Sequence, residues 1–254
     1  MNEVNRNYLN QHTDILSFRD LASGTVAAYT SYMTQFLDWS ESTLSKSVPD
    51  ITWEELRSYI KFLKDMRQLN ARTVNVHIAQ LRDFYHYVLH RDWDRYQVPY
   101  LHYDELLPRV PTKEEVNTII DSVPNPKHKA ELALLYSSGI RVRELCRLRC
   151  GHIYHSKHSI YISKSKNRSD RYAILSEKAY GLLPTYIRKF HPSATKDDWL
   201  FPGQKSGCHI CEQSVYAAFK KQLAALGWDP ATYTLHSLRH YVECFKMVSV
   251  RKIA

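Results

Sequence analysis

A chain of 254 residues is long enough for two domains, and its 44% hydrophobic and 12% aromatic content can form packed cores, which excludes global disorder. The sequence holds no run of 18 apolar residues, so we expect no membrane-spanning segment. Its five scattered cysteines, with no secretory signal pattern at the N-terminus, predict a reduced, cytoplasmic protein without a disulfide framework.

Charge is distributed unevenly along the chain. Residues 1–100 contain 11 Lys and Arg against 12 Asp and Glu, a net charge of −1, whereas residues 101–254 contain 24 against 14, a net charge of +10. A basic region attracts polyanions and releases the counterions that condense on a nucleic-acid backbone. The second region is therefore a candidate DNA-binding surface, although a basic surface without that role has the same composition.

The first part of the chain predicts a small helical bundle at about 15–95. Apolar residues recur at helical spacing over 23–40, the capping box Thr52-Trp53-Glu54-Glu55 begins a helix that reaches about residue 67, and a third apolar stripe runs over 71–90. We interpret these stripes as core. Three polar side chains on the opposite faces could contact DNA but are equally typical of a solvated surface: Arg72, Asn75 and Arg82.

Prolines interrupt the pattern over 96–108, which we predict to be a linker. A second domain then extends over 109–254. It begins with a second capping box at Thr112-Lys113-Glu114-Glu115, and its fold class is predicted to be mainly α with a small β-sheet. Its helices are expected at 113–121, 126–137, from about Arg141, and at about 176–190, 212–226 and 234–247. Its strands are expected at 159–163 and 171–175, as a hairpin with the basic segment 164–170 at its tip.

The pair Cys208 and Cys211 has the Cys-x-x-Cys spacing of zinc and redox sites. A structural zinc site needs a second pair of ligands, and Cys146 and Cys150 have a different spacing on a predicted helix and its exit. A reduced pair in a loop is the favoured interpretation, so we expect no metal and no cofactor.

Two segments stand out for their chemistry. The first is Ser138-Gly139-Ile140-Arg141-Val142-Arg143-Glu144-Leu145, and the second is His236-Ser237-Leu238-Arg239-His240. Between them lies the run Lys166-Asn167-Arg168-Ser169-Asp170-Arg171. Taken singly, each of these patterns is common on protein surfaces. In this order, with a hairpin between them, they resemble the paired arginine boxes and the hairpin loop of the tyrosine recombinase (phage integrase) family, which cuts and rejoins DNA. The resemblance covers about residues 20–240.

The resemblance implies an N-terminal helical core-binding (SAM-like) domain and a C-terminal recombinase catalytic domain that close around double-stranded DNA, with self-association on the DNA. It implies that Arg141 and Arg239 bind the scissile phosphate, because guanidinium groups bind phosphate oxygens bidentately and keep their charge. Lys166, or Lys164 as the alternative, would protonate the leaving 5′ oxygen, and His236 would shuttle the proton of the attacking hydroxyl. The two implied supporting residues are Glu144 and His240.

The family's nucleophile is a tyrosine that follows the second box at some distance, and only 15 residues follow Arg239 here. Tyr241 is a poor substitute, since two side chains two positions apart on a helix diverge by about 200°. We therefore expect a chain that ends before its nucleophile and binds DNA without cleaving it. A non-catalytic DNA-binding remnant or regulator is the nearest alternative, and a helical protein-interaction module with an incidental basic surface is the alternative from another class.

Overall fold

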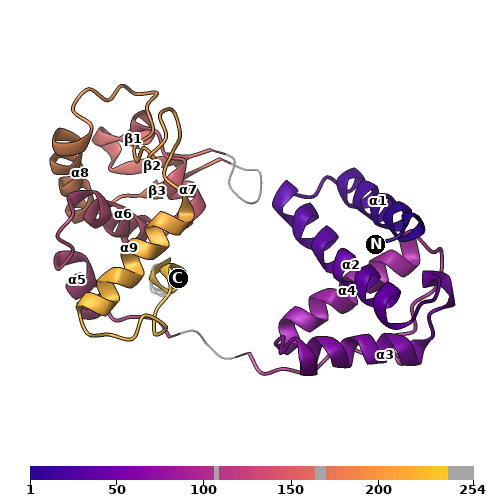
Figure 1. The fold of residues 1–254 in the computed structure, drawn as a ribbon. Coiled ribbons are helices and arrows are strands. Elements are labelled where there is room, and N and C mark those ends of the chain that lie inside the picture. Colours follow the sequence, from indigo (N-terminus) through magenta and orange to yellow (C-terminus); the bar gives the residue numbers. More distant parts are fainter. Residues whose placement is uncertain (106–108, 164–169, 240–254) are drawn as a thin grey trace, which may run out of the picture. The chain divides into compact units, whose positions relative to one another are not determined.

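The computed structural model describes residues 1–105, 109–163 and 170–239, and the chain forms two compact units, 1–106 and 107–254 (Figure 1). The expected fold class is confirmed, because both units are mainly helical and the second also holds a small three-stranded sheet. No helix in the described ranges is long and apolar enough to cross a bilayer.

The first unit packs four α-helices around an apolar core that includes Phe36, Tyr59 and Phe84. Capping fixes where two of the helices begin: the Thr52 hydroxyl accepts from the Glu55 N–H while Glu55 accepts from the Thr52 N–H, and Asn70 Oδ1 accepts from the Thr73 N–H. The elements are α1 (Glu3–Phe18), α2 (Ser23–Thr43), a 3₁₀ turn η1 (Val48–Asp50), α3 (Trp53–Lys61), a π-helical turn η2 (Phe62–Met66) and α4 (Ala71–Tyr87).

Helix α1 was not anticipated from the sequence. Its buried residues are Asn5, His12 and Leu16, so two of the three are polar and interrupt the apolar period. The helix nevertheless packs against α2, and Leu16 is fully buried. The first unit therefore contains one more helix than the apolar pattern predicts.

In its described residues, the second unit surrounds a larger core with helices α5 to α9, a helical turn that begins at Leu235, and the sheet. The strands are antiparallel in the order β1-β2-β3, with Ile160 opposite Ala173 and Ile162 opposite Arg171. Strand β1 is only two residues long and was not predicted. The elements are α5 (Lys113–Asp121), α6 (Pro126–Ser138), α7 (Val142–Cys146), η3 (Cys150–His152), β1 (Ile153–Tyr154), η4 (His155–Lys157), β2 (Ser159–Ile162), β3 (Arg171–Ile174), α8 (Glu177–Phe190) and α9 (Glu212–Ala225).

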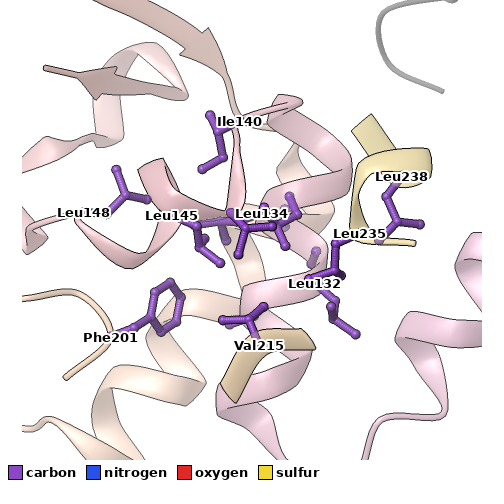
Figure 2. Close-up of a cluster of buried hydrophobic side chains, with 14 of the residues drawn as sticks. Leu132, Leu134, Ile140, Leu145, Leu148, Phe201, Val215, Leu235 and Leu238 are labelled. Carbon is purple, nitrogen blue, oxygen red and sulfur yellow. The ribbon is translucent and has the colours of Figure 1, made fainter. Parts of the chain in front are cut away.

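The core of the second unit joins segments that lie far apart in the chain (Figure 2). Leu132 and Leu134 of α6 lie between Leu145 of α7, Val215 of α9 and Leu238 near the end of the described range. Burial of large apolar side chains contributes roughly 1.5–3 kcal/mol each. This packing, rather than local helix propensity, fixes the position of the short α7.

Two buried histidines make the first unit sensitive to acid. His12 and His77 are almost fully buried, and desolvation lowers the pKa of each to about 4. The ring nitrogens of His12 have no hydrogen-bond partner within the described residues, whereas Nδ1 of His77 lies 3.3 Å from the Tyr59 hydroxyl. Both rings are therefore neutral in the folded unit near pH 7.

We predict that the first unit loses stability as the pH falls from about 6.5 towards about 4. The pKa of each histidine is lower in the folded unit than in the unfolded chain, so protons bind preferentially to the unfolded chain. The stabilisation is therefore complete above the unfolded pKa and is lost as the pH falls below it. Each histidine would account for about 2 kcal/mol between pH 7 and pH 5. Urea unfolding at several pH values measures it, and His12→Gln should flatten the dependence. An unchanged dependence in His12→Gln would refute the assignment to this residue.

Candidate functional site: an arginine-lined pocket

Three of the residues singled out in the sequence line one pocket of the second unit. Arg141, His236 and Arg239 surround a cavity of about 210 Å³, although Arg141 and Arg239 lie 98 positions apart in the chain. The other residues that line the cavity are Ile140, Val142, Arg143, Glu212, Tyr216 and Leu235. Three guanidinium groups and an imidazole, against the single carboxylate of Glu212, form a cavity suited to an anion.

Arg141 reaches the pocket through the turn between α6 and α7. Helix α6 ends at Gly139, whose φ of 64° lies in the left-handed region that glycine enters without steric strain. Ile140 then inserts into the core, where it is 1% exposed, and Arg141 becomes the N-cap residue of α7. The Ser-Gly-Ile-Arg sequence thus reverses the chain, anchors it and presents the arginine at a helix start.

The second arginine segment is anchored to the core by the helix face opposite the one that carries His236 and Arg239. A helical turn runs from Leu235 to Arg239, and its start is capped because the Thr234 hydroxyl accepts from the Ser237 N–H at 3.1 Å. Leu235 and Leu238 are buried in the core, as Figure 2 shows. Because residues three apart share a helix face, His236 and Arg239 are both directed away from that core and line the pocket together.

Tyr233 fixes the segment that leads into this turn. Its side chain is 2% exposed, its hydroxyl donates to Glu115 Oε1 at 2.8 Å, and the Arg109 guanidinium lies 5.1 Å from its ring centroid. Glu115 also belongs to the capping box of α5. The chain before the second box is therefore anchored to the first helix of the same unit.

Glu144 organises the first arginine. One carboxylate oxygen accepts from the Arg141 backbone N–H at 2.8 Å, and the other accepts from Arg141 Nη1 at 3.0 Å. The same carboxylate accepts from Arg171 Nη1 at 2.9 Å and Nη2 at 2.7 Å. Burial alone would raise the pKa of Glu144, but the hydrogen bonds from Arg171 and from the Arg141 N–H outweigh it and lower the pKa. Glu144 is therefore ionised at neutral pH.

Three residues that line the pocket were given no role from the sequence. Arg143, Glu212 and Tyr216 line the cavity, and Arg143 Nε lies 3.9 Å from Glu212 Oε1. Glu212 and Tyr216 belong to the first turns of α9, a helix whose exposed face carries no motif. Arg171 was part of the hairpin run, but nothing local showed that it pairs with Glu144, because that contact spans 27 residues.

The remaining candidates lie outside the described residues. These are Lys166 with its alternative Lys164, His240, and Tyr241. Cys208 and Cys211 are exposed free thiols, and the described ranges contain no group of three His, Cys, Asp or Glu side chains placed to hold a metal ion.

The fold and the two arginine segments define the class of the tyrosine recombinases. The chain belongs to the phage integrase family, since the family model matches residues 109–248 and the model of the phage integrase N-terminal SAM-like domain matches residues 8–95. This is a family of DNA recombination and integration proteins.

Curated relatives agree with this assignment. A protein named as an integrase/recombinase, y4eF of Sinorhizobium fredii, is 31% identical over 74% of this chain and 73% of its own length. A second protein so named from that organism, y4qK, is 32% identical over 74% of this chain, which spans only 59% of that relative. The tyrosine recombinase XerD of Rickettsia bellii is 23% identical over 89% of this chain and 80% of its own length.

Solved structures share the fold at low identity. A λ integrase tetramer bound to a Holliday junction superposes with a TM-score of 0.70, 17% identity, and coverage of 92% of this chain and 70% of that one. The Tn1549 transposon integrase in complex with a circular intermediate DNA gives a TM-score of 0.72, 14% identity, and coverage of 92% and 84%.

The packing of Leu238 should control the position of Arg239. We predict that Leu238→Ala, which opens a cavity at a fully buried position, destabilises the second unit by about 2–5 kcal/mol. The matched variant Leu182→Ala removes the same atoms from a partly buried position of α8 and should be much milder. Urea unfolding measures both. Equal effects would show that the second arginine segment is not held by the core.

Proposed function

We propose that this protein acts in site-specific DNA recombination by binding duplex DNA through the second unit and holding the scissile phosphate between Arg141 and Arg239. The observation that carries the proposal is the shared pocket: two arginines from segments 98 residues apart line one cavity together with His236. The excess of basic residues in 101–254 supports the same partner.

The proposed chemistry follows from the charge that develops on phosphorus during transesterification. Two guanidinium groups stabilise the nonbridging oxygens and orient the phosphorus, which is the largest contribution a preorganised site can make. His236 would take the proton from the attacking hydroxyl, and Lys166 would donate one to the leaving 5′ oxygen. Glu144 keeps Arg141 in place, and His240 would support the second box.

The arginines in the pocket should differ in their contribution to DNA binding. We predict that Arg141→Ala weakens binding of a mixed-sequence duplex about tenfold and lowers the salt dependence by about one counterion. Arg143→Ala should have a smaller effect, because its Nε already lies 3.9 Å from Glu212. Fluorescence anisotropy at several salt concentrations measures both. Salt-independent binding, or no binding at low salt, would favour the protein-interaction alternative.

We further propose that Tyr241 does not serve as the nucleophile. A hydroxyl held in line with phosphorus gains an effective molarity of about 10⁵ M or more. If the helix that contains Arg239 continued to position 241, the two side chains would diverge by about 200°. Tyr216 lines the pocket but precedes the second box, unlike the family's nucleophile.

The 254-residue chain should therefore bind a nicked suicide substrate without forming a phosphotyrosine link at Tyr241. Denaturing electrophoresis followed by peptide mapping tests this, with Tyr241→Phe and Tyr216→Phe as paired variants. Binding without any adduct would favour the non-catalytic regulator. An adduct that maps to Tyr241 would overturn the geometric argument.

A further inference from the structure

The carboxylate of Glu144 is shared between two guanidinium groups. Arg141 approaches it from the start of α7, and Arg171 approaches it from the start of β3, with three side-chain hydrogen bonds of 2.7–3.0 Å in all. The Glu144 side chain is only 9% exposed, so these contacts are weakly screened. A single buried negative charge thus holds two positive ones.

The two arginines share the Glu144 carboxylate unequally. Arg171 engages both carboxylate oxygens with its two terminal nitrogens, the fork geometry that binds carboxylates most strongly. The Arg141 guanidinium contributes only Nη1. Among the described residues, the hydrogen bonds and ion pairs of the Arg141 side chain involve Nη1 alone, so Nη2 and Nε are the donors that a phosphate in the pocket would use.

Arg171 is well placed for this role. It is the first residue of β3 and pairs with Ile162 at the end of β2, so the sheet fixes its backbone. Its side chain is 32% exposed and does not line the pocket cavity. Among the contacts of Arg171 that the structure describes, the one that leads to the pocket is its pair with Glu144.

We propose that Arg171 is a positioning residue: by taking up most of the Glu144 carboxylate, it prevents Glu144 from drawing Arg141 into a closed bidentate pair and leaves Arg141 directed at the phosphate. This inference rests on the proposed phosphate-binding role of Arg141. Without Arg171, the guanidinium hydrogen-bonded to this carboxylate among the described residues is that of Arg141, and Coulomb attraction favours its full engagement there.

The test is calorimetric titration of the full chain with inorganic phosphate. Arg171→Ala should weaken phosphate binding about tenfold. Arg171→Lys keeps the charge but loses the fork geometry, so its phosphate affinity should lie between those of the wild type and Arg171→Ala. Arg147→Ala, which removes an exposed arginine at the C-terminal end of α7, is the matched control and should change the affinity little. Thermal melts identify any variant that fails to fold.

A double-mutant cycle separates positioning from general support. In a Glu144→Gln background the carboxylate charge is gone, so Arg171→Ala should then weaken phosphate binding less than about threefold. An equal loss in both backgrounds would overturn the proposal, because a structural or long-range role of Arg171 does not need the Glu144 charge. Wild-type affinity in Arg171→Ala would overturn it as well.

The failure of the proposed function would look different. If Arg141→Ala leaves phosphate binding unchanged, the phosphate-binding role of Arg141 is wrong and the positioning role falls with it. If Arg141→Ala abolishes binding while Arg171→Ala does not weaken it, the pocket assignment stands and only the inference about Arg171 fails.

Discussion

In the proposed function, the constraint on which the site depends is that like charges are held together to bind a phosphate. Arg141 and Arg239 line the same cavity, and their mutual repulsion opposes that arrangement whenever the cavity is empty. The Glu144 carboxylate offsets part of the repulsion while it also caps α7. The cavity is lined by more positive than negative side chains, which favours an anion and supports the proposed phosphate ligand.

Apolar packing supplies the geometry that electrostatics alone cannot. Leu235 and Leu238 place one face of a helical turn in the core and thereby direct Arg239 into the pocket. The buried Ile140, which directly precedes Arg141, likewise directs Arg141 into the pocket. Each arginine directly follows a buried apolar residue, Ile140 or Leu238, which fixes its backbone.

The sequence could predict what is encoded locally. The capping boxes at Thr52 and Thr112 and the β-prone runs beside Ile160 and Ala173 specify elements within a few residues, and the structure has these elements. Helix α1 was missed because its buried face uses Asn5 and His12 as well as Leu16, and polar residues on a buried face hide the apolar period.

In the candidate site, too, the sequence predicted the local motifs but not the contacts between distant elements. The arginine boxes were visible because residue types at fixed spacing resemble a family. The pairing of Arg171 with Glu144 and the placement of Tyr216 in the pocket depend on tertiary packing between elements, which no local pattern records.

The central claim is that one phosphate is bound by both arginines. The most direct test is a titration of the full chain with inorganic phosphate, followed by nuclear magnetic resonance of the arginine side chains. The account predicts that the signals of Arg141 and Arg239 shift together and give the same dissociation constant. Shifts at only one of them, or two different dissociation constants, would contradict it.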